Sequence, residues 1–310
     1  PDTWHVSEVP QPTPGRGQVL VAVEAAAIDR GTWHLMTGEP LLMRPVFGFR
    51  GLRQPVPGRD VAGTITALGD GVEGLAVGDR VYGTADGSLA EHALAKAERL
   101  ARAPRGLSAL AAAVVPMSGQ TALAAVHDAG RVAAGQRVLV TGASGGVGTF
   151  AVQLAIAAGA DVTAVCSGAK APAVRLLGAD PVVDHTVAGA VDALLAEQAR
   201  FDVIVDVAGR YPVSRLRRSL VPDGTLVIVG GESGGRWTSG YGRSVRAALR
   251  SPFVRQRLVI LAAGERTRDL DRLTDLLESG AVVPVIDSVH PLERAADAMR
   301  RLESGAVTGK

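Results

Sequence analysis

The sequence predicts an α/β protein, with a doubly wound parallel sheet beside a second, mostly β domain. Beyond residue 115, near-continuous apolar runs alternate with helical segments, which is typical of parallel strands covered on both faces. Before residue 110, short alternating runs are bounded by Gly and Pro turns, as in β-rich domains. A glycine-rich turn near residue 145 joins one apolar run directly to a helix.

Composition limits the class of protein. The 310 residues are 47% hydrophobic and 21% charged, which allows a large core and excludes wholesale disorder. No apolar stretch reaches about 18 residues, so we expect no membrane-spanning helix. Cys166 is the only cysteine, which excludes an intrachain disulfide and a structural zinc site built from several thiolates. The chain opens at Pro1 without an export leader, and we expect a cytoplasmic protein without a metal ion.

The elements expected before residue 110 are short strands. They cover Val19–Glu24, Val61–Leu68 and Arg80–Gly83. The phrases Gly69-Asp70-Gly71 and Gly78-Asp79 indicate turns, because glycine reaches positive φ at little cost.

Six apolar strands in series follow, which describes a nucleotide-binding domain. They are expected at Arg137–Thr141, Asp161–Cys166, Pro181–Asp184, Phe201–Val207, Thr225–Val229 and Leu258–Leu261. Helices are expected at Gly146–Ala158, Ala171–Leu177 and Val187–Ala199. The tail has a short piece over Val282–Ile286 and a helix over Leu292–Leu302 that stops at Ser304-Gly305. We assign residues 1–113 and 281–310 to the mostly β domain and residues 114–280 to the nucleotide-binding domain.

The strongest local signal is the run Val138–Thr149, in which a strand enters a glycine turn and then a helix. Such a turn gathers backbone N–H groups at the positive end of a helix, which suits a pyrophosphate. The alternative is a tight turn without a ligand, and the six-strand series argues against it. The candidate contacts are Ser144, Gly145, Gly146, Val147 and Gly148.

The loop after the next strand predicts which dinucleotide binds. An NAD site usually has an acid there for the ribose 2′-hydroxyl, and the loop from Cys166 to Lys170 has none. The hydroxyl of Ser167 and the ammonium of Lys170 would instead accept a 2′-phosphate, which favours NADP(H). The alternative is that Ser167 caps the next helix and Lys170 is solvated.

The order of motifs resembles the medium-chain dehydrogenase/reductase family, in its zinc-independent quinone oxidoreductase branch. The matching segments are Pro12–Val21, Pro57–Thr64, Val77–Tyr82, Pro116–Leu123 and Gly142–Gly148. The resemblance implies a mostly β GroES-like catalytic domain and a Rossmann domain. It also implies hydride transfer in a cleft between them.

The zinc positions of the family cannot complete a tetrahedral site of nitrogen and sulfur ligands here. Zinc alcohol dehydrogenases of the family have Cys where this chain has Asp29, and a His-Glu pair where it has Arg59-Asp60. Without zinc there is no Lewis acid to polarise an alcohol. We therefore expect reduction of an electron-poor acceptor, a quinone or an α,β-unsaturated carbonyl.

The resemblance also implies residue roles. Asp29 would lie beside the nicotinamide, where relatives often have Asn, and Thr121 would lie near the nicotinamide or its phosphate. As alternatives, Asp29 would be a turn residue paired with Arg30, and Thr121 an ordinary helix N-cap. A carboxylate at position 29 would also stabilise the positively charged oxidised ring.

Further contacts are implied at the carboxyl edge of the sheet. His185 stands where many relatives have a Tyr near the adenosine phosphate, and its alternative is a solvated loop residue. Ala208-Gly209 and Gly230-Gly231 end two strands at the edge where doubly wound sheets bind ligands.

The substrate side lacks the tyrosines that relatives often have between residues 30 and 50. Trp33, His34, Phe47 and Phe49 stand there instead. His34 is the side chain there that titrates near neutral pH, so it is our candidate proton donor. A buried structural histidine and protonation by water are the alternatives.

An arginine-rich stretch lies late in the chain. From Arg210 to Arg257 there are ten arginines and two acids. Residues 236–257 read either as a solvated surface helix or as a flap or membrane-surface patch. No nucleic-acid partner is expected. The strand Leu258–Leu261 could be an edge strand that pairs in a homodimer.

The expected function is an NADPH-dependent, zinc-independent reductase of a quinone or conjugated carbonyl. One alternative is an NADPH-binding sensor or partner module without turnover. The other is a zinc-free alcohol dehydrogenase.

Overall fold

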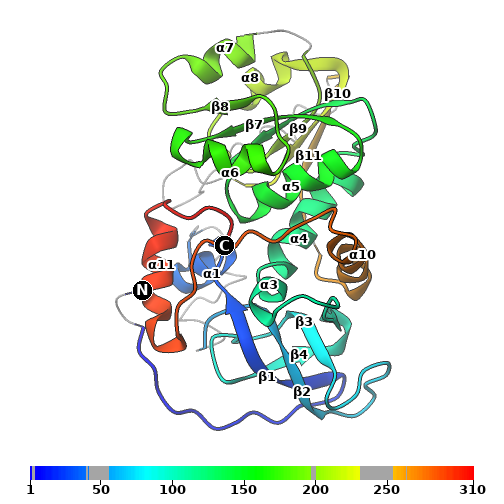
Figure 1. Ribbon diagram of the computed structural model, residues 1–310, viewed down its shortest axis with the longest axis vertical. Helices are drawn as coiled ribbons and strands as arrows, with labels where there is room; N and C mark the ends of the chain where they lie inside the picture. Colours follow the sequence, from blue (N-terminus) through cyan, green and yellow to red (C-terminus); the bar gives the residue numbers. More distant parts are fainter. Residues whose placement is uncertain (2–3, 40, 42–55, 197–199, 231–253, 263) are drawn as a thin grey trace.

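The computed structural model describes residues 1, 4–39, 41, 56–196, 200–230, 254–262 and 264–310. Two sheets lie at opposite ends of the molecule, with helices α3, α4 and α10 between them (Figure 1). The end of the chain returns to this middle region. The end of the chain therefore lies in the region between the two sheets.

The first sheet has five strands in the order β4-β1-β2-β3-β5, and all its pairs are antiparallel. The strands are β1 (Gln18–Ala27), β2 (Asp60–Leu68), β3 (Arg80–Thr84), β4 (His92–Lys96) and β5 (Leu100–Arg102), with the 3-10 turn η2 (Ala97–Arg99) before the last. Two helices accompany it, α1 (Arg30–Thr37) and α3 (Ala109–Ala113). The inward side chains of Val19, Val61, Ile65 and Val81 are fully buried, as the alternating pattern predicts.

The second sheet has six parallel strands in the order β11-β10-β9-β6-β7-β8. The strands are β6 (Arg137–Thr141), β7 (Asp161–Cys166), β8 (Val182–Asp184), β9 (Phe201–Asp206), β10 (Leu220–Ile228) and β11 (Arg257–Ile260). All six match the predicted strands within a few residues. The order reverses between β6 and β9, so ligands are expected there, outside the carboxyl ends of the strands.

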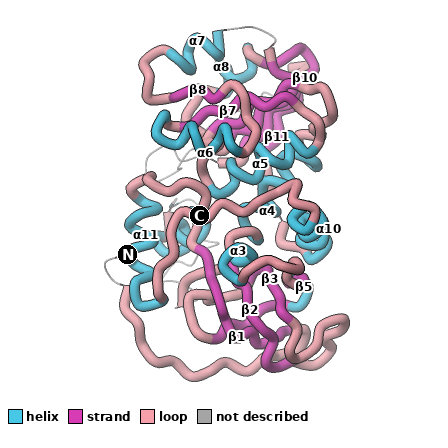
Figure 2. The backbone as a smooth tube through the Cα atoms, in the orientation of Figure 1, coloured by secondary structure: helices cyan, strands magenta, loops and turns pink. Residues whose placement is uncertain are grey.

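Helices cover both faces of this sheet (Figure 2). They are α5 (Gly146–Ala157), α6 (Ala171–Leu176), α7 (Ala190–Ala196), α8 (Val213–Arg218), with the 3-10 turn η4 (Gly168–Lys170) before α6. Leu139 lies in a core cluster with helices α7 and α8, whereas Val138 and Val140 lie in another with α5. Each such side chain contributes about 2 kcal/mol by its burial, so strands apolar on both faces are stable only between two helical layers.

The middle region joins the two sheets through α4 (Pro116–Leu123) and α10 (Thr267–Glu278), and α4 continues into the π-helical turn η3 (Ala124–Ala129). The hydroxyl of Tyr82 in β3 donates to the carbonyl of Leu270 at 2.7 Å, and Thr267 donates to the carbonyl of Leu100 at 2.9 Å. Tyr82 is fully buried. These bonds attach α10, which follows the parallel sheet in sequence, to the antiparallel sheet.

The tail forms the 3-10 turn η6 (Leu292–Arg294) and α11 (Ala295–Glu303), close to the predicted helix, and Gly305 leaves it at φ 70°. Val282–Ile286 forms no strand in the described structure. It is a connecting segment in which the carbonyl of Val285 accepts a bond from the amide of Lys310, while the amide and carbonyl of Val283 bond to the side chain of Gln153 in α5. The final residues then form a parallel bridge between Gly309 and Gly145 of the glycine loop.

Some expectations fall outside the described residues. These are Gly231, Phe47, Phe49 and residues 236–253 of the arginine-rich stretch. In the described part of the chain, β11 is the outer strand of the sheet, as expected, while the homodimer stays a prediction. No helix among the described residues has both the length and the apolarity needed to cross a bilayer.

Candidate functional site

The glycine loop lies at the carboxyl end of β6. Gly142 turns the chain with φ 69°, and Gly145 is the N-cap of α5 with an extended backbone, φ −82° and ψ 174°. The amide of Thr149 donates to the carbonyl of Gly145 at 2.9 Å, which is the first i→i−4 bond of this helix. The amides of Gly146, Val147 and Gly148 therefore have no partner within the helix, and they mark an anion site.

The glycines of this loop differ in how close an added Cβ atom would come to its neighbours. A Cβ on Gly148 would lie 2.1 Å from the carbonyl oxygen of Gly142, so this glycine is required by packing. A Cβ on Gly145 would meet only that same oxygen, at 3.5 Å, and its φ suits any residue. The fold therefore leaves open space at Gly145, at the helix N-terminus, where only this one atom would lie within 4 Å of a Cβ.

Gly146 faces the tail. A Cβ there would lie 2.8 Å from the Ser118 hydroxyl and 3.3 Å from Cγ of Lys310. The amide of Gly309 donates to the carbonyl of Ser144 at 2.8 Å. The last two residues of the chain thus lie against the glycine loop, which the sequence patterns did not predict.

The ends of β6, β9 and β10 meet beside this loop. The amide of Ala208 donates to the Thr141 hydroxyl at 3.4 Å, and the amide of Gly209 donates to Asp206 at 3.3 Å. A Cβ on Gly230 would lie 2.3 Å from the carbonyl of Val207, so Gly230 packs against the end of β9. Ala208, Gly209 and Gly230 are brought together at the predicted edge.

Asp206 orders this edge and was not predicted. It is fully buried and accepts a 2.6 Å bond from the Thr141 hydroxyl on the neighbouring strand. A signal was present, because an acid ending an apolar run in the strand series must find a partner.

The loop after β7 holds the residues predicted to bind the adenosine end. Ser167 occupies the N-cap position of η4, but its side chain makes no capping bond. Lys170 is not simply solvated, since its Nζ donates to the carbonyls of Gly305 at 2.6 Å and Val307 at 2.8 Å. Two of its three N–H groups hold the tail, which leaves one for a ligand.

An acid does lie next to this loop, although not within it. Asp184 ends β8, and its carboxylate accepts bonds from the amide and hydroxyl of Thr186, both at 2.8 Å. The bonds from Thr186, with a smaller contribution from the amide of Gly168, lower the pKa of Asp184. His185 follows, and its amide donates to the carbonyl of Cys166 at 2.9 Å. Asp184 therefore fixes the loop on which Ser167 lies.

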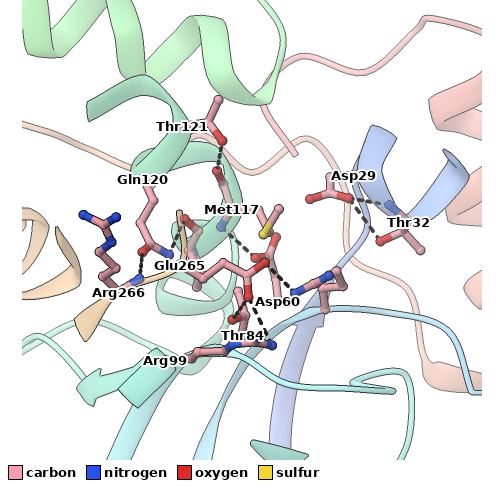
Figure 3. A network of polar contacts seen from close by, with 12 residues as sticks. Asp29, Thr32, Asp60, Thr84, Arg99, Met117, Gln120, Thr121, Glu265 and Arg266 are labelled. Atoms are coloured by element: carbon pink, nitrogen blue, oxygen red, sulfur yellow. Dashed lines mark hydrogen bonds and ion pairs between the residues drawn. The ribbon is translucent and has the colours of Figure 1, made fainter. Parts of the chain in front are cut away.

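Figure 3 shows Asp29 beside Thr32, and Thr121 above Met117 in α4. Asp29 is the N-cap of α1, where it accepts bonds from the amide of Thr32 at 2.7 Å and its hydroxyl at 3.1 Å. Thr121 is inside α4 rather than at its N-cap, and its hydroxyl donates to the carbonyl of Met117 at 2.6 Å. The N-cap alternative for Thr121 was wrong.

His34 lies on α1, partly buried, with its ring edge-on to Trp33 at 5.1 Å between centroids. Its Nδ1 is 2.8 Å from the carbonyl of Glu39, an acceptor, so Nδ1 carries the hydrogen. In this arrangement only Nε2 can exchange a proton with a ligand. Its role as a proton donor stays a prediction.

A buried charge cluster lies between α1 and the glycine loop. Lys310 bonds through Nζ to the carboxylate of Asp60 and lies 3.6 Å from that of Asp29. The side chains of Asp60 and Lys310 are 0% and 4% exposed. The other oxygen of Asp60 accepts a 2.8 Å bond from the amide of Met117, at the start of α4.

Burial dominates the electrostatics of this cluster. Loss of hydration raises the pKa of Asp60 to about 6, although Lys310 opposes the shift. Burial lowers the pKa of Lys310, but attraction by Asp60 and then Asp29 outweighs it, and the net pKa is raised. The cluster thus holds a carboxyl that titrates near neutral pH beside an ammonium that stays charged.

Lys310 was missed because nothing around it in the sequence has a pattern. The available signal was the rarity of lysine: of 33 basic residues, only Lys96, Lys170 and Lys310 are lysines. Two of these three take part in the site.

A second polar network joins the segment after β11 to the antiparallel sheet. Figure 3 shows Glu265 beside Thr84 and Arg99. Its carboxylate accepts bonds from Arg59 at 2.5 Å and Thr84 at 2.8 Å, and lies 3.4 Å from Arg99. Arg266 adjoins it, with its amide donating to Gln120 in α4 at 2.9 Å. Nε of Arg59 is buried and has no hydrogen-bond partner in the described structure.

The donors at the family's zinc positions do not suit zinc. Arg59 cannot act as a ligand, and Asp29 and Asp60 are joined by Lys310 instead of a metal. Within the ranges that the structure describes, no group of three His, Cys, Asp or Glu side chains is placed to hold a metal ion.

Comparisons with known proteins find relatives over nearly the whole chain. The alcohol dehydrogenase GroES-like domain matches residues 15–105, and the zinc-binding dehydrogenase domain matches residues 177–310. The chloroplast envelope quinone oxidoreductase homolog of Arabidopsis thaliana is 33% identical, over 99% of this chain and 92% of that protein. The 2-methylene-furan-3-one reductase of Solanum lycopersicum is 32% identical, over 98% of this chain and 73% of its own length.

A solved structure has the same architecture. Mycobacterial Rv1454c complexed with NADPH is 28% identical and superposes with a TM-score of 0.80, over 98% of this chain and 93% of that one. The chain belongs to the medium-chain dehydrogenase/reductase family of oxidoreductases, in its quinone oxidoreductase-like branch.

Proposed function

We propose that the chain is an NADPH-dependent reductase that transfers a hydride to a quinone or an α,β-unsaturated carbonyl without zinc. The observation that carries the proposal is the open space at Gly145, below three helix amides without helical partners. The names of the Arabidopsis and tomato relatives and the NADPH complex of Rv1454c support the same chemistry.

The residues present fit such a cofactor. The amides of Gly146, Val147 and Gly148 would hold its diphosphate, with Ser144 and Gly145 beside them. Ala208, Gly209 and Gly230, with Gly231 beyond the described residues, would border its middle at the carboxyl edge. When bound, the cofactor would supply the hydride, and the protein would supply binding, orientation and electrostatics.

The 2′-phosphate would lie at the loop after β7. Ser167 has a hydroxyl that the helix cap does not use, and Lys170 has one N–H group left for an anion. His185, in the neighbouring loop after β8, would contact the phosphate when protonated. These groups would recognise a phosphate better than a bare ribose hydroxyl, because Lys170 carries a positive charge.

The substrate side would be formed by α1 and α4. Asp29 and Thr121 would face the nicotinamide, and Nε2 of His34 would be available to the acceptor. A quinone or conjugated carbonyl is already electron-poor, so it accepts hydride without the Lewis acid that an alcohol dehydrogenation needs. This chemistry agrees with the arginine at position 59, which cannot bind zinc, and with the ammonium of Lys310 between Asp29 and Asp60.

The test is to incubate purified protein with NADPH and a broad panel of quinones and enones, and to follow the loss of NADPH absorbance. We expect oxidation with at least one acceptor, unchanged after treatment with a chelator. If NADPH binds but no acceptor oxidises it, the reductase proposal fails and a cofactor-binding sensor is favoured. Activity that a chelator abolishes and zinc restores would contradict the metal-free proposal.

A further inference from the structure

Three charged side chains from distant parts of the chain lie together in one buried cluster. Asp29 precedes α1, Asp60 begins β2, and Lys310 comes from the tail. The ammonium of Lys310 bonds to Asp60 and lies 3.6 Å from Asp29. The exposed fractions of the three side chains are 14% for Asp29, 0% for Asp60 and 4% for Lys310.

The other charged or titratable groups near the cluster are Arg59, next to Asp60, and Arg30 and His34 in α1, the helix that Asp29 caps. Asp60 pairs with Ala27 of β1 and Thr84 of β3, and α4, which supplies the amide of Met117, has no charged side chain. The glycine loop has none either. The adjacent guanidinium of Arg59 is paired with Glu265. The proton affinity of Asp60 is therefore set by its burial, Lys310 and Asp29.

The charge balance of the cluster is uneven. With both carboxylates ionised, two negative charges share one ammonium, and the cluster has a net charge of −1. A proton on Asp60 makes it neutral. Because charges interact strongly in a poorly hydrated site, a positive charge brought nearby would favour the ionised form and expel that proton.

The cluster adjoins the proposed cofactor site. Lys310 lies against Gly146, its neighbour Gly309 bonds to Ser144, and Asp29 is the residue expected beside the nicotinamide. The ring is neutral when reduced and positively charged when oxidised. The cluster therefore lies where it can respond to that change of charge.

We propose that Asp29, Asp60 and Lys310 form a buried proton store that releases a proton when the nicotinamide beside it is oxidised. The inference rests on the proposed function, since it needs NADP(H) bound at the glycine loop. It assigns a role to Lys310 and Asp60. The negative charge appears as the ring becomes positive.

The proton also completes the reduction. Adding a hydride to a quinone or enone gives an anion, which takes up one proton to become the product. In the store, the O–H bond of Asp60 breaks and its proton passes to Nζ of Lys310, while an N–H bond of the same ammonium breaks and that proton passes to the anion, forming its new O–H or C–H bond. Asp60 then recovers its proton from solvent, so the step balances without another oxidant or reductant.

The test measures protons rather than turnover. NADP⁺ and NADPH are each titrated into the protein at pH 6, by calorimetry in buffers of different ionisation enthalpy. The two ligands carry the same diphosphate, so the difference in protons released reports the ring charge alone. If the ring charge lowers the pKa of Asp60 by about one unit, NADP⁺ releases about 0.4 proton more than NADPH.

Two variants locate the source of that proton. Asp60→Asn should abolish the difference, while Asp223→Asn, which removes an exposed partner of Arg255, should leave it unchanged. Lys310→Met should move the difference to higher pH, because Asp60 loses the cation that favours its ionised form. If Asp60→Asn does not fold, the shift in Lys310→Met carries the test.

The remaining outcomes overturn the inference, the proposed function or both. Equal proton release for the two ligands in the wild-type protein, or a difference that survives Asp60→Asn, would show that the cluster stores no redox-linked proton. If both ligands bind but no acceptor is reduced, the proposed function fails. The difference in proton release between NADP⁺ and NADPH then still decides whether the cluster stores a proton. Binding of neither ligand would defeat both.

Discussion

Lys310 forms an ion pair with Asp60, a residue 250 positions earlier in the sequence, and both side chains are buried. The pair connects the tail to the first residue of β2. Because the tail also bonds to the glycine loop through Gly309, the pair joins the two sheets at the proposed cofactor site. Its properties can be measured without any ligand.

The first prediction concerns stability and pH. Asp60 has a pKa raised from 3.8 to about 6 in the folded protein, so the native state binds more protons than the unfolded state between these values. Its contribution to stability is complete below pH 3.8 and is lost as the pH rises through 6. The loss amounts to about 3 kcal/mol.

The measurement is urea unfolding of the wild-type protein and Asp60→Asn across this pH range. The difference in unfolding free energy, wild type minus variant, should fall as the pH rises. A difference that rises with pH, or stays constant, would show that the pKa of Asp60 is not raised.

The second prediction concerns Glu265. Glu265→Ala removes the partner of two arginines, Arg59 and Arg99, whose side chains are only 22% and 27% exposed. Uncompensated, partly buried cations should destabilise the protein by about 2–3 kcal/mol. As a control, Asp223→Ala removes the exposed partner of Arg255 and should cost less than about 0.5 kcal/mol. Similar unfolding midpoints for the two variants would contradict the prediction.

The third prediction concerns Gly148. A Cβ at this position would clash with the carbonyl oxygen of Gly142. Gly148→Ala should therefore destabilise the protein by about 2–4 kcal/mol. The unfolding midpoint in urea measures the effect. A midpoint equal to that of the wild-type protein would mean that the loop can move aside, and that packing does not explain this glycine.

The fourth prediction concerns the choice of NADPH over NADH. Ser167→Ala should weaken NADPH binding several-fold and leave NADH binding almost unchanged, since the hydroxyl is expected to contact only the 2′-phosphate. Lys170→Ala should weaken both, because Lys170 also holds the carbonyls of Gly305 and Val307 in the tail. Affinities follow from fluorescence titration. A Ser167 variant that keeps the full preference would place the phosphate elsewhere.

The parallel sheet could be predicted because its strands have a strong local signature. Arg137–Thr141 and Asp161–Cys166 coincide with β6 and β7, since each is an apolar run preceded by a turn and buried on both faces. Val282–Ile286 has similar composition, but a strand needs a neighbouring strand, and this segment bonds to the side chain of Gln153 in α5 and to Lys310 of the tail instead.

The charged part of the site could not be predicted in the same way. Lys310 and Asp60, or Glu265 and Arg59, are joined by the fold across some 200 residues or more, and nothing in their local sequence marks the partner. The same holds for Lys170. The sequence predicted that this loop cation binds phosphate or is solvated. Its bonds to the tail could not be predicted, because they depend on where α11 ends. Burial and pairing of single charges arise only from tertiary structure.

The central claim is that Gly145 leaves space for a diphosphate rather than for packing. The most direct measurement is an NADPH titration of the wild-type protein and Gly145→Ala, together with their unfolding midpoints. We predict that the variant folds within about 1 kcal/mol of the wild type, the cost of a weaker N-cap, and that it binds NADPH at least tenfold more weakly. Equal affinity for NADPH, or failure of the wild-type protein to bind it, would contradict the account.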